Sequence, residues 1–149
     1  MLMRKINTII IHCSATPSDM DIGADEIRKW HKDRGWRDIG YNYVIRRDGT
    51  LELGRDLDGD GNVDEEVGAH ARGFNSTSIG ICLIGGLSSK GEGEANFTYQ
   101  QYKQLHELVF VLDIKYNIEK VMGHRDLPGV SKECPCFDVS GFFEHKGVL

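Results

Sequence analysis

The sequence lacks the features of a secreted disulfide-rich protein or a membrane protein. Only four of the 149 residues are cysteines and three are prolines. No apolar run approaches the roughly 20 residues that a transmembrane helix needs. The first such run, residues 9–11, is also far too short for the apolar region of a signal peptide. We therefore expect a chain without a membrane span that is made in the cytoplasm and carries no export signal.

An excess of positive charge is also missing. The chain has 18 Lys and Arg residues against 23 Asp and Glu residues, which gives a net charge of -5. A general nucleic-acid binder needs a basic face to neutralise phosphates, so we expect no nucleic-acid partner. Without an export signal, Cys13, Cys82, Cys134 and Cys136 are expected to be free thiols or metal ligands rather than disulfides.

The patterns that are present predict one α/β domain over residues 1–149, with a mixed central β-sheet flanked by helices. Runs of β-branched or alternating apolar residues indicate strands. Helices are indicated by apolar residues at helical spacing and by the capping box that begins at Thr98. Strands are predicted at residues 5–12, 41–46, 50–53, 79–84 and 121–122, and helices at 25–34, 98–116 and 137–149.

Two residues inside these elements have ordinary structural explanations. Cys82 lies within the continuous apolar run of residues 79–84, so we expect a small core side chain there. His31 lies on or beside the apolar stripe of the first predicted helix, where a packed or hydrogen-bonded imidazole is expected. An Asp-Gly pair at residues 48–49 predicts a hairpin turn, which makes part of the sheet antiparallel.

An acidic stretch at residues 56–66 leaves two interpretations open. Asp56, Asp58 and Asp60, followed by Gly61, match the opening of a calcium-binding loop. The twelfth position is Val67, where such a loop needs a bidentate Glu. The stretch is therefore either a calcium site with a missing ligand or a solvated surface turn, and the second interpretation is favoured.

Two histidines and a cysteine form a candidate metal site. His12 ends the first predicted strand, His124 follows the last one, and Cys134 lies in a loop beside a proline. Ligands of α/β sheets bind at the carboxyl ends of the strands. Two imidazoles and one thiolate leave a fourth tetrahedral position of Zn²⁺ open, as catalytic zinc requires. Alternation along a strand points Cys13 to the face opposite His12.

The sequence resembles the N-acetylmuramoyl-L-alanine amidases of the phage-lysozyme type, a family that includes the peptidoglycan recognition proteins. His-Cys-Ser-Ala-Thr begins at His12, and Gly-Ala-His-Ala-Arg-Gly surrounds His70. The matching segments occur in family order over almost the whole chain, at residues 12–16, 26–32, 35–36, 40–41, 47–50, 68–73, 78–86 and 124–135. The acidic stretch at 56–66 departs from the family pattern as an insertion.

The resemblance implies roles for individual residues. His12, His124 and Cys134 take the family's zinc-ligand positions, and Tyr41 and Lys132 take its two catalytic positions. His70 falls in a substrate-groove segment. The implied reaction is hydrolysis of the amide bond between N-acetylmuramic acid and L-alanine in peptidoglycan, with one Zn²⁺ per chain.

The resemblance also implies a biological setting. The chain would be a monomeric phage or prophage endolysin that reaches the cell wall after release, through a holin or lysis. Two other functions stay open at this point. One is a non-catalytic peptidoglycan-binding module, against which the presence of Cys134 argues. The other is a regulatory binder, for example one that inhibits a polymerase.

Overall fold

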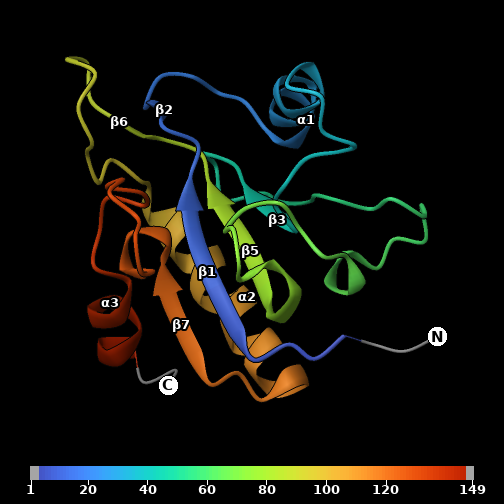
Figure 1. Cartoon of the computed structure of the whole chain (residues 1–149). Coiled ribbons are helices and arrows are strands. Elements are labelled where there is room, and N and C mark those ends of the chain that lie inside the picture. The colour runs from blue at the N-terminus through green and yellow to red at the C-terminus, as the bar shows by residue number, and fades with distance from the viewer. Residues whose placement is uncertain (1–3, 147–149) are drawn as a thin grey trace.

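Five strands form a central mixed sheet in the computed structural model, which describes residues 4–146 (Figure 1). They are β1 (Thr8–Cys13), β3 (Tyr43–Ile45), β4 (Leu51–Leu53), β5 (Ser78–Leu83) and β7 (Lys120–Gly123). Their order is β4-β3-β5-β1-β7, in which only β4 is antiparallel to its neighbour. The predicted α/β class and mixed sheet are confirmed.

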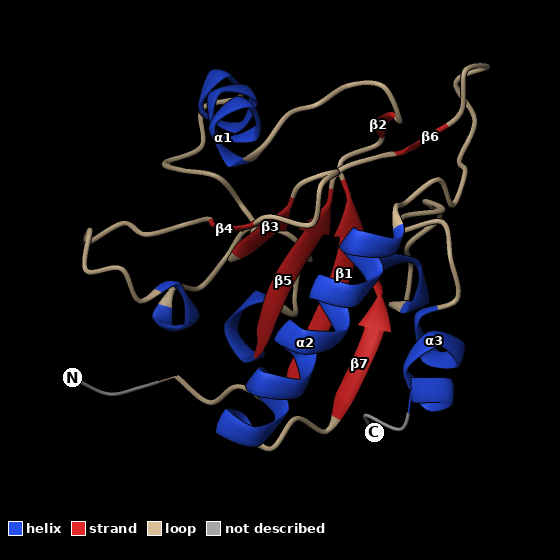
Figure 2. Cartoon of the chain, turned by 180° about the vertical axis from the view of Figure 1, so that it is seen from behind, coloured by secondary structure: helices blue, strands red, loops and turns tan. Residues whose placement is uncertain are grey.

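Helices cover both faces of this sheet. They are α1 (Ala24–Asp33), α2 (Tyr99–Tyr116) and α3 (Val139–Lys146). Helix α2 crosses one face, with α3 beside β7, and α1 packs on the other face near the carboxyl ends of the strands (Figure 2). Each predicted helix is present; the last was predicted to reach residue 149, and residues 147–149 lie outside the described part. Across residues 4–146, no helix is both long and apolar enough to cross a membrane.

Some short elements were not predicted. β2 (Thr16–Pro17) and β6 (Gly86–Leu87) form a second, two-stranded sheet in segments for which no strand was predicted. Three 3-10 turns, η1 (Val63–Glu65), η2 (Asn75–Thr77) and η3 (His124–Asp126), were also missed. Elements of two or three residues are too short to show a hydrophobic period, so the sequence carries little signal for them.

Alternation along β1 separates the core from the other face of the sheet. Ile9, Ile11 and Cys13 belong to the main core cluster, which includes the buried residues of α2. Ile10 packs in a different cluster, with Ala71 and Leu127. Because successive side chains of a strand point to opposite faces, His12 shares the second face with Ile10. Cys13 accordingly packs into the core side, as predicted.

Local sequence signals explain where β3 and β4 turn and where α2 begins. Gly49 has a φ of 90° between β3 and β4, a conformation that glycine adopts without strain. Cys82 is completely buried, as expected for a small core side chain. Thr98 caps α2, and the predicted capping box with Gln101 is present.

The Thr98 cap provides a test of the fold. Its hydroxyl accepts a hydrogen bond from the Gln101 N–H (3.1 Å) and donates one to the Arg47 carbonyl (2.7 Å). We expect Thr98→Ala to lower the free energy of unfolding by about 1–2 kcal/mol, measured by urea denaturation. Ser89→Ala, in an exposed loop, is the control and should change it by less than about 0.5 kcal/mol. Equal effects of the two variants would contradict the assigned cap.

Candidate metal centre

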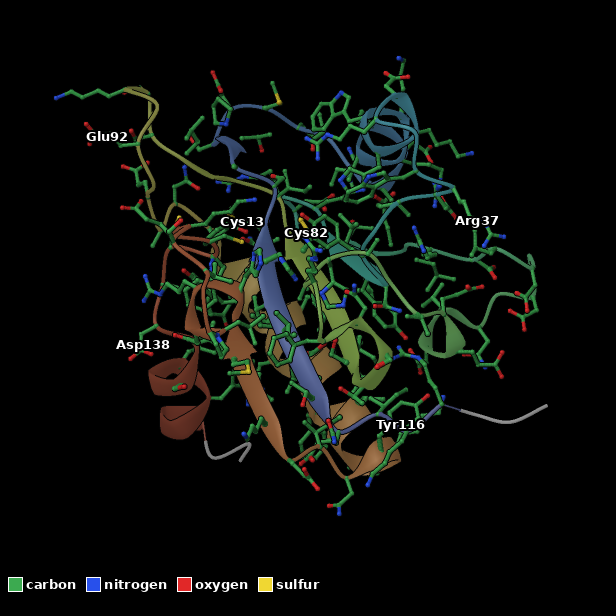
Figure 3. The ribbon with its side chains drawn as sticks, viewed as in Figure 1. Cys13, Arg37, Cys82, Glu92, Tyr116 and Asp138 are labelled. Atoms are coloured by element: carbon green, nitrogen blue, oxygen red, sulfur yellow. The ribbon has the colours of Figure 1, made fainter. Side chains whose placement is uncertain are left out.

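The parallel register of β1 and β7 brings the two predicted histidines together. Ile11 lies opposite Gly123, and the residue that follows each of them in the chain is a histidine. The ring centroids of His12 and His124 are 4.6 Å apart. Cys13 and Cys82 mark this carboxyl end of β1 and β5, whereas Tyr116 lies at the opposite end of the sheet (Figure 3). The pairing of β1 with β7 therefore brings together His12 and His124, which are 112 positions apart in the sequence.

Two backbone hydrogen bonds position Cys134 against these histidines. The Arg125 N–H donates to the Cys134 carbonyl at 2.8 Å, which ties the loop to η3. The Cys13 N–H donates to the Cys134 sulfur at 3.1 Å. Cysteine sulfur is a common zinc ligand, so this contact holds a possible ligand atom beside His12. The loop therefore carries its sulfur to the end of β1.

The three predicted ligands form one donor group. One ligand atom each from His12, His124 and Cys134 lie within 4.8 Å of one another. Burial, with charge from His70, His124 and Lys132, lowers the pKa of His12 well below its usual value. Burial and the charge of Lys132 also lower the pKa of His124. Both imidazoles are therefore neutral at pH 7, the form in which a ring nitrogen can bind a metal.

His70 lies behind His12 rather than in the open part of the cleft. Its Nδ1 is 2.8 Å from His12 Nε2, and its Nε2 is 3.3 Å from the Ser78 hydroxyl. Burial lowers the pKa of His70 to about 3, so its ring is neutral. The residue was expected in a substrate groove. It does line the cleft wall, but both of its ring nitrogens face protein groups.

Tyr41 and Lys132 line the same cleft as the three ligands. The cleft has a volume of about 260 Å³. The Tyr41 ring centroid is 5.0 Å from that of His12. Burial raises the pKa of the Tyr41 phenol well above its usual value, so this group keeps its proton at neutral pH. Lys132 is exposed. Tyr41 was predicted inside a strand, but β3 begins only at Tyr43, so this boundary was wrong by two residues. The Tyr41 carbonyl still accepts a hydrogen bond from the Arg55 N–H at 2.9 Å.

His31 contributes to the wall of the cleft from α1. Its Nδ1 accepts a hydrogen bond from the Gly40 N–H at 2.9 Å, and its ring packs at a tilt against that of Trp36, with centroids 4.5 Å apart. The expectation of a packed, hydrogen-bonded imidazole is confirmed. Trp36 is partly exposed at the rim of the cleft, where it offers a flat apolar surface.

The acidic stretch shows no sign of a calcium loop beyond its first residues. One carboxylate oxygen each of Asp56, Asp58 and Asp60 lie within 4.8 Å of one another. Asp56 accepts a hydrogen bond from the Gly61 N–H at 2.8 Å, so at least part of this group caps its own turn. The stretch leads into the three-residue turn η1 and not into a long helix. Calcium binding by this stretch has no further support.

Two buried polar residues near the site were missed. Asn42 is completely buried and binds the Gly80 N–H with its oxygen and the carbonyls of Val63 and Glu66 with its amide nitrogen. It thereby attaches the acidic stretch to β5. Ser78 is also completely buried, behind His70. A lone Asn or Ser carries no periodic signal, so only the three-dimensional arrangement shows these roles.

Comparison with known proteins identifies the family. The sequence profile described as N-acetylmuramoyl-L-alanine amidase matches residues 2–137. The chain belongs to this family of peptidoglycan amidases, as the resemblance implied.

Relatives match over nearly their whole length. The chain is 46% identical over 146 residues to the endolysin of Klebsiella phage KP32, which covers 98% of this chain and 91% of that protein. It is 43% identical to the endolysin of Escherichia phage T7, over 96% of this chain and 89% of that one. The solved structure of the N-acetylmuramoyl-L-alanine amidase LysC from Clostridium intestinale has a TM-score of 0.79 and 30% identity, covering 98% of this chain and 88% of that chain.

The buried imidazole of His31 gives a pH test. Burial, with the charges of Arg34 and Arg55, lowers its pKa from 6.5 to about 4. The unfolded chain therefore binds a proton that the folded chain does not, and stability is lost as the pH falls from about 6.5 towards 4. His31→Asn keeps an acceptor for the Gly40 N–H without titrating. We expect the free energy of unfolding of this variant to fall less over the same pH range. Each unit by which the His31 pKa is lowered accounts for about 1.4 kcal/mol of the difference. Urea denaturation across this range measures it, and parallel curves for both proteins would contradict the assignment.

Proposed function

We propose that this chain is a zinc-dependent endolysin that hydrolyses the amide bond between N-acetylmuramic acid and L-alanine in peptidoglycan. The observation that carries the proposal is the convergence of His12, His124 and Cys134 in one cleft with Tyr41 and Lys132. The family match supports the reaction, and the similarity to phage endolysins supports the setting.

The residues present fit zinc. Two neutral imidazoles and a thiol that accepts an N–H hydrogen bond are donors that Zn²⁺ prefers, and three protein ligands leave one position for a substrate or solvent molecule. Hard cations such as Mg²⁺ or Ca²⁺ instead require oxygen ligands. When bound, zinc supplies Lewis-acid chemistry, which polarises the amide carbonyl and favours attack by water at neutral pH.

Lys132 and Tyr41 would stabilise the charge that develops during hydrolysis. Water forms a bond to the lactyl carbonyl carbon, the C–N bond breaks, and the amine of L-alanine leaves with an added proton. Negative charge develops on the carbonyl oxygen, and the Lys132 ammonium stabilises it electrostatically. Tyr41 lines the same cleft and stays protonated, so its hydroxyl would serve as a hydrogen-bond donor to that oxygen.

The cleft also explains how a peptidoglycan strand would be held. Trp36 and His31 form an aromatic wall on the α1 side, and His70 and Ala69 lie beside them. Aromatic faces of this kind pack against the apolar faces of sugars and peptide stems, while the polar atoms beyond them orient the amide. We propose that a single chain acts alone on peptidoglycan, after release to the cell wall through a holin or lysis.

Removal of the metal tests the zinc site. We expect Cys134→Ser, and likewise treatment of the wild type with a chelator, to lower the rate of release of stem peptides from purified cell wall by at least about 100-fold. Added Zn²⁺ should restore the chelated wild type but not Cys134→Ser. Cys136→Ser, which removes a neighbouring thiol outside the donor group, is the matched control and should stay active. If metal-free protein released peptides at the rate of the zinc-loaded form, the proposal would be wrong.

Lys132 tests the electrostatic role separately from metal binding. We expect Lys132→Ala to retain zinc and to lower kcat about 100-fold, because the charge on the carbonyl oxygen loses its partner. Lys132→Arg should recover part of the rate, and Lys90→Ala, in an exposed loop, should change nothing. Turnover is followed by mass spectrometry of the released peptides, which also identifies the cleaved bond. An unchanged kcat in Lys132→Ala would exclude this role.

A further inference from the structure

We propose that His70 and Ser78 form a hydrogen-bonded relay that fixes the tautomer of His12, so that its Nδ1 carries the free lone pair that faces the metal. The inference rests on the zinc site of the proposed function and assigns His70 a positioning role. The relay runs from His12 Nε2 to His70 Nδ1 (2.8 Å), and from His70 Nε2 to the Ser78 hydroxyl (3.3 Å). It ends where that hydroxyl meets the Phe74 carbonyl (2.7 Å).

The last member of the relay sets its direction. A carbonyl oxygen can only accept, so the Ser78 hydroxyl donates its single proton to Phe74. Ser78 must then accept from His70, which places the proton of the neutral His70 ring on Nε2. Nδ1 of His70 is therefore an acceptor, and His12 must donate to it from Nε2. The remaining nitrogen of His12, Nδ1, is left without a proton.

If the hydrogen bonds ran in the opposite direction, His70 Nε2 and the Ser78 hydroxyl would face each other without a proton between them. If His70 donated from Nδ1, its Nε2 would be an acceptor facing a hydroxyl whose proton is already used. His12 would then carry its own proton on Nδ1, where a metal could not bind. Only the His12 tautomer with its proton on Nε2 can bind a metal through Nδ1. The Phe74 carbonyl favours this tautomer because it takes the Ser78 proton.

Two glycines hold the His70 ring in place. A Cβ added at Gly80 would lie 2.5 Å from Cγ of His70, and one at Gly68 would lie 2.7 Å from its Cδ2. The ring therefore fits into space that any larger residue would fill. The backbone N–H groups of His70 and Ala71 both donate to the Asn75 side chain at 2.9 Å, which fixes the main chain as well. Position 80 therefore requires glycine because a side chain there would displace the His70 ring.

A fixed second partner raises the affinity of a histidine ligand, and loss of such a partner lowers metal affinity by about 10–100-fold. This role differs from substrate binding. Both ring nitrogens of His70 are occupied by protein groups, so the ring has no free polar atom to offer a substrate. A substrate contact would affect KM, whereas a tautomer relay affects the metal in the absence of any substrate.

The test measures zinc affinity without substrate. Apoprotein competes with a chromogenic chelator for Zn²⁺, in the wild type and in three variants that break different parts of the relay. These are Ser78→Ala, His70→Phe and Gly80→Ala. We expect the Kd for zinc to rise about 10–100-fold in His70→Phe and Gly80→Ala, and less in Ser78→Ala. His70→Asn, which can place an amide oxygen where Nδ1 lies, should restore most of the affinity. Ser76→Ala, with an exposed side chain, should bind as the wild type does.

A second measurement examines the tautomer itself. The ¹⁵N chemical shifts of the His12 ring in the zinc-free protein should show a proton on Nε2 in the wild type. Ser78→Ala, with its fold intact, should show a mixture of tautomers. A proton on Nδ1 in the wild type, or unchanged zinc affinity in both His70→Phe and Gly80→Ala, would overturn the relay. If the wild type bound no zinc, the proposed function would fail instead, and the ¹⁵N shifts would still decide the relay.

Discussion

The site depends on the alternation of side chains along β1. Ile9, Ile11 and Cys13 enter the core under α2, which leaves Ile10 and His12 on the other face. A slip of one residue would exchange the two sets, burying an imidazole in the core and exposing isoleucines in the cleft. The free energy of packing the isoleucines therefore also fixes the position of His12. Parallel pairing with β7 then aligns His124 beside it.

Burial supplies the second condition for the site. Burial on the second face of the sheet lowers the pKa values of His12, His124 and His70, so that all three rings are neutral at pH 7. Their unprotonated nitrogens are then available to bind a metal or to accept hydrogen bonds. Lys132 stays exposed, so its charge costs little desolvation and still acts across the cleft. The same cleft thus combines neutral imidazoles with the exposed positive charges of Lys132 and Arg34.

Much of the fold could be predicted from the sequence because its main elements are long and periodic. The strand runs, the capping box at Thr98 and the Asp-Gly turn each have a local cause, and all are found. The convergence of His12, His124 and Cys134 was inferred from strand ends and from family resemblance, and strand register explains it. The roles of Asn42, Ser78 and Gly80 could not be inferred, because they depend on contacts between distant segments.

The central claim is that His12, His124 and Cys134 together bind one zinc ion, and X-ray absorption at the zinc edge tests it most directly. The account predicts one sulfur at about 2.3 Å and two imidazole nitrogens at about 2.0–2.1 Å in the zinc-loaded wild type. Cys134→Ser should lose the sulfur signal, and Cys136→Ser should keep it. A zinc shell without sulfur in the wild type, or one that retains sulfur in Cys134→Ser, would contradict the account.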